Sequence, residues 1–257
     1  MDLLEYRTSV EDNRHPWELA RFDVMLRLLK DYLPGPPRHI ADIGCGDTFV
    51  VNSLANNYPE SKFIAVDTAF TDADIRNFES INKQADIKLL RSISDISLQK
   101  KSLDLVLLMD VIEHIEEDKE FVKEIVNQDW ISSSTLFLVT VPAFQSLYSA
   151  HDKHLLHYRR YNKTNLENTL RNADLEVLDS GYFFSTLVAV RVLQKGLESL
   201  FGAKKQEGLA NKNYSSRKLG LIKNTLLLDF SLTHTIHQLN IDIPGLSSYA
   251  ICRKSVQ

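Results

Sequence analysis

Short apolar runs alternate along the chain with stretches whose apolar residues recur every three or four positions. The short runs have the length of buried strands, and the longer stretches are typical of helices that bury one face. Five strands are predicted in succession, at residues 39–43, 62–66, 87–90, 103–109 and 136–141. A helix is predicted before the first strand, from its apolar residues Phe22, Leu26, Leu29 and Leu33. This alternation predicts an α/β fold with a mostly parallel, doubly wound sheet.

Two more strands are predicted near the end of the chain, at residues 175–182 and 248–252, giving seven in all with an antiparallel last strand. The stretch between them far exceeds the roughly 2–5 residues of a hairpin loop. We therefore expect a helical insertion at 186–243 within a single domain that spans 1–257. Its two apolar stripes lie at Val190, Leu193, Leu197 and Leu200 and at Leu228, Leu232, Ile236 and Leu239.

This insertion is expected to cover the acceptor pocket as a lid from Leu187 to Leu239. Residues 203–218 carry five basic residues against one acid and form its expected mobile tip. A helix pair that packs away from the site as extra core is the alternative. The basic tip also leaves a weak contact with anionic lipid head groups open.

Composition narrows the class of protein. The 257 residues carry a net charge of -4, which disfavours a nucleic-acid-binding surface. No apolar run approaches the about 18 residues of a membrane-spanning helix, and the first residues do not have the pattern of a signal peptide. Only two cysteines occur, Cys45 and Cys252, so a disulfide framework is not expected. We expect a soluble, cytoplasmic protein of unknown oligomeric state.

A glycine pair follows the first predicted strand directly, in the segment Gly44-Cys45-Gly46. Glycines at this position let the backbone approach a ligand closely. Asp67 ends the second strand, where a carboxylate can accept hydrogen bonds from ribose hydroxyls. A dinucleotide-binding loop would continue to a third glycine, but Phe49 stands there. Asp47 would repel a phosphate, whereas it tolerates the ammonium and sulfonium groups of S-adenosylmethionine.

Three segments carry a family resemblance. Asp42-Ile43-Gly44-Cys45-Gly46 resembles the first motif of class I, Rossmann-like S-adenosylmethionine-dependent methyltransferases. Residues 103–114, ending in Asp110-Val111-Ile112-Glu113-His114, resemble the fourth-strand motif of that family. Residues 141–161, with His157-Tyr158-Arg159-Arg160-Tyr161, are similar to an uncharacterised subgroup of small-molecule methyltransferases. One position differs, because Thr48 stands where the family commonly has glycine.

The resemblance implies a binding site for S-adenosylmethionine. Its glycines would admit the methionine moiety, Asp67 would hold the ribose, Ser92 and Ile93 would lie beside the adenine, and Met109 would flank the methionine. The implied cofactor residues are Asp42, Gly44, Cys45, Gly46, Asp67, Ser92, Ile93, Met109 and Asp110. An N-terminal set resembles the segment that covers the cofactor in this subgroup, namely Tyr6, His15, Trp17 and Arg21.

The candidates for acceptor chemistry come from the fourth and fifth strand ends. A base is needed only if an acceptor hydroxyl must lose its proton, and His114 and His151 are the candidates for that catalytic role. Structural roles for both histidines stay open. The expected substrate-binding residues are His151, His157, Tyr158, Arg159 and Tyr161. Arg159 and Arg160 could bind a substrate anion or pair with an acid of the fold.

No metal is expected, although two groups of residues raise the possibility. Asp110, Glu113 and His114 resemble the acidic and histidine motif of quinone-type O-methyltransferases, for which a divalent metal is implied. The second group, with a composition that zinc can bind, is His151, Asp152, His154 and His157.

The predicted function is methyl transfer from S-adenosylmethionine to a small molecule, with O-methylation expected. A sugar, a lipid-linked intermediate or a secondary metabolite fits as the acceptor. Two other functions stay open. One is a non-catalytic module that binds S-adenosylmethionine or a nucleotide, and the other is an NAD-dependent oxidoreductase, which the missing third glycine disfavours.

Overall fold

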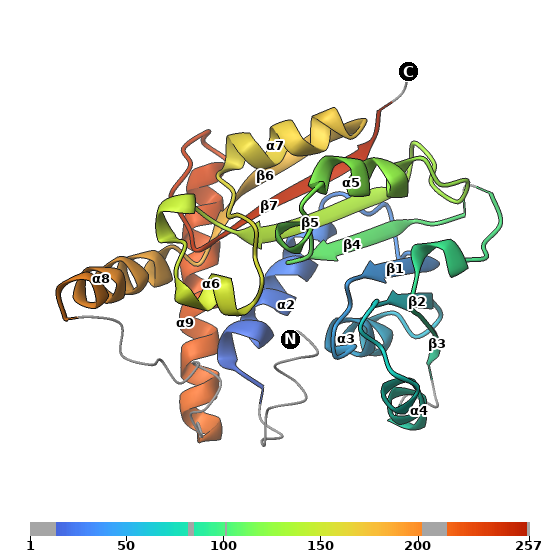
Figure 1. The fold of residues 1–257 in the computed structure, drawn as a ribbon, viewed down its shortest axis with the longest axis horizontal. Coiled ribbons are helices and arrows are strands. Elements are labelled where there is room, and N and C mark those ends of the chain that lie inside the picture. The colour runs from blue at the N-terminus through green and yellow to red at the C-terminus, as the bar shows by residue number, and fades with distance from the viewer. Residues whose placement is uncertain (1–13, 82–84, 101, 202–214, 256–257) are drawn as a thin grey trace.

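The computed structural model describes residues 14–81, 85–100, 102–201 and 215–255. Their strands form one sheet in the order β3-β2-β1-β4-β5-β7-β6 (Figure 1). All neighbours are parallel except that β7 runs antiparallel to β5 and β6. The strands are β1 (His39–Ile43), β2 (Lys62–Val66), β3 (Asp86–Leu90), β4 (Leu105–Met109), β5 (Leu136–Pro142), β6 (Leu175–Phe183) and β7 (Ser247–Lys254). The predicted α/β fold with an antiparallel last strand is confirmed.

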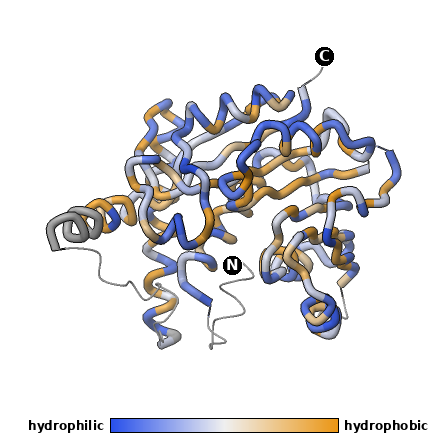
Figure 2. Tube along the Cα trace, in the orientation of Figure 1, coloured by the Kyte–Doolittle hydropathy of each residue, from blue (hydrophilic) through white to orange (hydrophobic). Residues whose placement is uncertain are grey.

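Helices cover both faces of the sheet (Figure 1). One face packs against α2 (Pro16–Lys30), α3 (Phe49–Asn57), α4 (Asp72–Ile81) and α9 (Ser216–His237). The other packs against α5 (Asp118–Val126) and α7 (Lys163–Asn172). Successive strand residues point to opposite faces, so Ile40 belongs to the first core and Ala41 to the second. The central strands β4 and β5 are hydrophobic along their length because both of their faces are buried (Figure 2).

The first helix begins earlier than the pattern of apolar residues predicts. α2 starts at Pro16 because His15 is its N-cap and accepts a hydrogen bond from the backbone N–H of Trp17 at 3.3 Å. Proline is favoured at the first helical position, where its missing N–H is not needed. The earlier start places Trp17 and Arg21 on the helix itself.

The predicted insertion contains two helices, α8 (Ser185–Phe201) and α9. α9 lies along α2, where Lys223 pairs with Asp23 at 2.8 Å, and it contributes Leu226 and Phe230 to the core. The buried Asp229 of α9 accepts hydrogen bonds from the first backbone N–H groups of α8. α9 is therefore part of the core layer. Residues 203–214 of the expected tip lie outside the described residues.

The start of α8 lies against the segment that follows β5. α8 contacts the 3-10 helix η3 (Gln145–Leu147), and Arg191 donates a hydrogen bond to Oγ of Ser149 at 2.5 Å. Exposed apolar side chains on α8 include Val190, Val192 and Leu193. Among the described residues, no helix combines the length and apolar character that crossing a bilayer requires.

Substitutions at two glycines test how tightly the backbone packs at residue 245 and within α9. A Cβ on Gly245 would overlap the backbone of Phe183, so Gly245→Ala should lower the free energy of unfolding by about 1–3 kcal/mol. Gly220 lies within α9 with open space around it, so Gly220→Ala should raise stability by about 0.5–1 kcal/mol. Chemical denaturation measures both changes. Equal effects of the two substitutions would contradict the packing described for residues 183 and 245.

Candidate functional site

The glycine turn after β1 is held against the end of β2. The backbone N–H groups of Gly44 and Cys45 donate to the carbonyl of Val66 at 2.7 and 3.1 Å. The N–H of Gly46 donates to Oδ2 of Asp67 at 2.9 Å. Both glycines have positive φ angles, +74° and +56°. The turn and the predicted ribose-binding carboxylate therefore form one unit.

Gly44 also packs against the fourth-strand segment. A Cβ at Gly44 would lie 2.6 Å from Cγ2 of Val111, which is closer than side chains approach. From the sequence, only the close approach of a ligand is expected at this glycine. The structure adds a contact with the protein itself, so a larger residue at this position would strain the fold as well as the site.

Thr48 has the left-handed backbone conformation, with φ 62° and ψ 8°. This is the position where the resembled family commonly has glycine, and the backbone conformation supplies the reason. A β-branched residue in this conformation is strained by about 1–2 kcal/mol. Oγ1 of Thr48 accepts a hydrogen bond from Asn52 at 3.1 Å, which ties the turn to the first turn of α3.

Asp42 lies on β1 directly before the turn and is buried. Its Oδ2 has no hydrogen-bond partner among the described residues. Burial raises the pKa of Asp42 to about 7, although the positive charge of Arg21 opposes the shift. Burial also raises the pKa of the neighbouring Cys45 thiol well above its usual value. Asp42 therefore keeps its proton below about pH 7, and the Cys45 thiol stays protonated at neutral pH.

Two arginines from the N-terminal segment pair with acids at this edge. Arg14 contacts Asp47 at 2.6 Å, and its guanidinium lies 3.9 Å from the ring centre of Phe49. Arg21 forms a short ion pair with Asp110, whose other oxygen accepts a hydrogen bond from Thr140 at 3.1 Å. These contacts place the start of α2 over the predicted cofactor site.

The other members of the expected covering set take different positions. The ring of Trp17 lies 4.9 Å from the guanidinium of Arg21, and His15 caps α2. Tyr6 lies outside the described residues. The Arg14–Asp47 pair was not predicted, because its partners are 33 positions apart and no local pattern joins them.

The remaining predicted cofactor residues follow two neighbouring strands. Ser92 caps the 3-10 helix η1 (Ile93–Asp95) just after β3, and its hydroxyl accepts from the N–H of Ser94 at 3.2 Å. Met109 ends β4 and is buried. The ends of β1, β2, β3 and β4 meet at one edge because these strands are parallel. The structure thus brings the predicted cofactor set to a single edge.

Asp152 holds together the segment from Ser149 to Tyr161, which follows β5 and carries the predicted substrate-binding residues. It is fully buried and binds the guanidinium of Arg160 through both oxygens, at 2.6 and 3.2 Å. Its carboxylate also contacts Nδ1 of His157 at 3.1 Å and forms a capping box with Ser149. Burial alone would raise the pKa of Asp152, but the hydrogen bonds from His157 and Arg160 outweigh it and hold the pKa below its usual range.

A second buried carboxylate, Asp118, binds the end of this segment, at Arg159 and Tyr161. The hydroxyl of Tyr161 donates to Asp118 at 2.6 Å, and Arg159 pairs with the same oxygen at 3.1 Å. Burial and this hydrogen bond raise the pKa of Tyr161, so its hydroxyl stays protonated. Tyr158 is 52% exposed, and its backbone N–H donates to the carbonyl of Glu113 at 2.8 Å. The loop is therefore attached directly to the segment after β4.

Glu113 lies close to His114 and His157, where the segment after β4 meets the segment after α6. Both carboxylate oxygens of Glu113 are buried without a hydrogen-bond partner in the described part of the chain. The rings of His114 and His157 meet edge to face, with 4.6 Å between their centres. Burial, and then the charge of Asp110, raise the pKa of Glu113 well above its usual value.

His151 and His154 lie on the short helix α6 (Ala150–His154), and both side chains are accessible. Neighbouring atoms still shield His151 enough to lower its pKa, against the opposing effect of Asp152. His151 is therefore neutral near pH 7 and can accept a proton. Its catalytic role stays a prediction.

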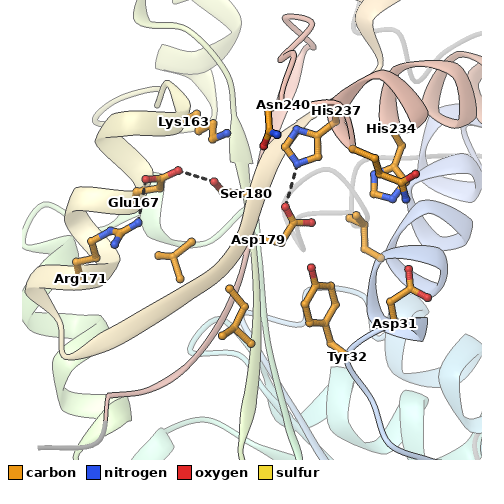
Figure 3. Close-up of a pocket in the computed structure, with 14 residues that line it drawn as sticks. Asp31, Tyr32, Lys163, Glu167, Arg171, Asp179, Ser180, His234, His237 and Asn240 are labelled. Atoms are coloured by element: carbon orange, nitrogen blue, oxygen red, sulfur yellow. Dashed lines mark hydrogen bonds and ion pairs between the residues drawn. The ribbon is translucent and has the colours of Figure 1, made fainter.

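A separate cavity of about 400 Å³ opens beside β6, between α7 and α9 (Figure 3). There His237 bridges Asp179 at 2.9 Å and Asp242 at 2.7 Å, and Lys163 pairs with Asp242. None of the predicted cofactor or acceptor residues lines this cavity. The ion pairs of His237 and Lys163 fasten α9 and the following loop to β6 and α7.

Comparisons with known proteins fit this arrangement. Residues 41–128 match a family described as "Methyltransferase domain". A protein of Mycolicibacterium smegmatis, described as a probable S-adenosylmethionine-dependent methyltransferase, is 25% identical over 199 residues. The alignment covers 76% of this chain and 74% of that protein. The matched family region contains the glycine turn, Asp67 and the segment from Asp110 to His114.

Solved structures share the fold. Coclaurine N-methyltransferase, bound to N-methylheliamine and SAH, is 14% identical with a TM-score of 0.56, over 95% of this chain and 73% of that one. The cyclase SpnF is also 14% identical, with a TM-score of 0.55 over 97% of this chain and 87% of its own. At these identities the likeness concerns the fold alone, and one fold can serve different reactions.

The buried Asp42 predicts how stability depends on pH. From about pH 4 to about pH 7 the unfolded chain ionises Asp42 while the folded chain keeps the proton, so its contribution to the free energy of unfolding falls as pH rises and then levels off. Asp42→Asn should remove this slope, on the order of 4 kcal/mol across the window. Denaturation curves of both proteins at several pH values, without ligand, measure it. Parallel curves would contradict the assignment, and Asp86→Asn, at an exposed site, is the control.

Proposed function

We propose that this chain, a class I S-adenosylmethionine-dependent methyltransferase by its family match, its relative and its fold, methylates a hydroxyl group of a small molecule. The observation that carries the proposal is the hydrogen bond from Tyr158 to the carbonyl of Glu113. It attaches the acceptor-side loop to the segment that begins with Asp110. A bound methyl donor and an acceptor would therefore meet between these two segments.

S-adenosylmethionine is the cofactor, and we assign its parts to the residues at the sheet edge. Asp67 holds the ribose hydroxyls, the turn from Gly44 to Gly46 receives the methionine moiety, and Asp42 supports that turn from β1. Ser92 and Ile93 flank the adenine, and Met109 and Asp110 form the wall beside the methionine. The acids at this edge favour the cationic sulfonium and ammonium groups and disfavour a pyrophosphate, which argues against an NAD-dependent enzyme.

On the acceptor side we assign His151 as the base that removes the hydroxyl proton. Methyl transfer is a direct displacement at the methyl carbon, so alignment of donor and acceptor supplies much of the acceleration. His114 is the second candidate base, since it adjoins Glu113 directly after β4. Tyr158 contacts the acceptor through its exposed ring.

The other proposed substrate-binding residues support the pocket indirectly, because carboxylates hold them in place. His157 and Arg159 are held by carboxylates, and the hydroxyl of Tyr161 is buried against Asp118. Their bonds fix the loop that carries Tyr158. Within a single domain of residues 1–257, we propose that the insertion at 186–243 covers this pocket. The contact of Arg191 with Ser149 supports that position for α8, while α9 anchors the insertion to α2.

A sugar, a lipid-linked intermediate or a secondary metabolite supplies a suitable hydroxyl. The exposed apolar residues of α8 favour an acceptor with an apolar part. The net charge of -4 disfavours nucleic acid. Two free, buried cysteines support a cytoplasmic, reducing location. A non-catalytic binding module is the second candidate, and turnover separates it from an enzyme.

Asp67→Ala tests the cofactor assignment. The variant loses hydrogen bonds to the ribose and the bond to Gly46, so the affinity for S-adenosylmethionine should fall by about 1–3 kcal/mol, or roughly 5- to 150-fold. Calorimetric titration measures the dissociation constant. Asp86→Ala, at an exposed position on β3, should leave it unchanged. Unaltered affinity in a folded Asp67→Ala protein would exclude the ribose role.

His151→Ala tests the acceptor chemistry. With labelled S-adenosylmethionine and a panel of hydroxylated acceptors, kcat should fall by about 10²- to 10⁴-fold while cofactor affinity is retained. The wild-type rate should rise with pH through a pKa below the usual 6.5, and the variant should lose this limb. His154→Ala, three positions along the same helix, is the matched control. Wild-type turnover by the His151 variant would rule out its role as base.

A further inference from the structure

Glu113 is an exception to the way buried charges are usually satisfied. Its side chain is fully buried, and neither carboxylate oxygen has a hydrogen-bond partner among the described residues. Native proteins leave few buried polar groups in this state, and each such group needs an explanation. A ligand that binds the carboxylate would supply one.

Two imidazoles lie close to this carboxylate. One ligand atom each from Glu113, His114 and His157 lie within 4.8 Å of one another. A metal ion bonds such nitrogen and oxygen atoms at about 2.0–2.2 Å, so small side-chain rotations would bring all three onto one ion. The residues come from the segment after β4 and from the loop after α6, which the hydrogen bond from Tyr158 to Glu113 already joins.

Asp152 prepares His157 for this role. The carboxylate is ionised and can only accept, so Nδ1 of His157 donates its proton to Asp152 across 3.1 Å. Nε2 then carries the lone pair that a metal requires. A histidine ligand whose second nitrogen binds a carboxylate is the usual arrangement at zinc sites.

We propose that Glu113, His114 and His157 bind a divalent transition-metal ion of the zinc type. Two imidazoles and one carboxylate form a ligand set suited to zinc and its neighbours, and they leave a coordination position for water or an acceptor oxygen. The ion satisfies the isolated carboxylate of Glu113. It also links the segment after β4 to the acceptor loop. Metal binding stands independently of the proposed O-methylation and is measured without any acceptor.

This ligand set differs from both groups that the sequence raised. Asp110 is held by Arg21 and Thr140, so its carboxylate is already compensated. His151 and His154 are accessible and are not members of the described cluster. Asp152 belongs to the site through His157 and Arg160 rather than as a ligand.

Titration with Co²⁺ tests the site, because bound Co²⁺ gives visible absorption bands that report its ligands. The full chain, free of any tag and stripped with a chelator, should bind one Co²⁺ per molecule, and Zn²⁺ should displace it. Glu113→Gln and His157→Ala should each weaken binding by more than about 100-fold, and Asp152→Asn by about 10- to 100-fold. His154→Ala, a neighbouring exposed histidine, should bind as the wild type does.

Affinity for S-adenosylmethionine and the far-ultraviolet circular dichroism of each variant establish that it is folded. Failure of the wild type to bind Co²⁺ at one per chain while it binds the cofactor would overturn the metal site and leave the methyltransferase proposal intact. Binding that survives Glu113→Gln would overturn it as well. Glu113→Gln keeps the size of the side chain, so it decides the question if His157→Ala does not fold.

Discussion

The fold places several acidic side chains at one edge of the sheet, and the surrounding residues must compensate their negative charge. Parallel strands end side by side there and carry carboxylates at their ends, with Asp42 buried and Asp67 and Asp110 partly exposed. Arg14 and Arg21 reach Asp47 and Asp110 from the N-terminal segment. Arg160 pairs with another acid, Asp152 on α6. Burial raises the pKa of Asp42, so this carboxyl keeps its proton below about pH 7. Several acids of this edge are therefore compensated within the protein itself.

The parts of this fold that depend on local pattern could be predicted from the sequence. β4 is apolar on both faces because it lies in the middle of the sheet, and its continuous apolar run identified it. The glycine turn could be recognised because its backbone conformation excludes most other residues. Thr48 was noted as a departure from the family, and its left-handed conformation explains why glycine is common there. The edge expected to bind the cofactor was inferred from the glycine turn, from Asp67 and from the family resemblance.

Contacts between distant residues could not be predicted in the same way. Arg21 and Asp110 are 89 positions apart, and α9 meets α2 across most of the chain. The apolar stripes of the insertion predicted two helices, but the stripe expected to be buried on the second one was wrong. Leu228, Leu232 and Leu239 are exposed, and α9 is buried through Leu226 and Phe230 instead. α9 completes the core, whereas α8 lies by the acceptor loop. The isolated carboxylate of Glu113 also depends on burial, which only the assembled structure determines.

The position of β7 has a consequence for how the chain reaches its native state. β7 lies between β5 and β6, although it follows both along the chain. Until a ribosome has released β7, the strands on either side of it have open edges, and β6 has no neighbour in the sheet. Unpaired strand edges promote association between nascent chains. The helices between β6 and β7 lengthen this vulnerable interval, so assembly of the native sheet waits until β7 has been synthesised.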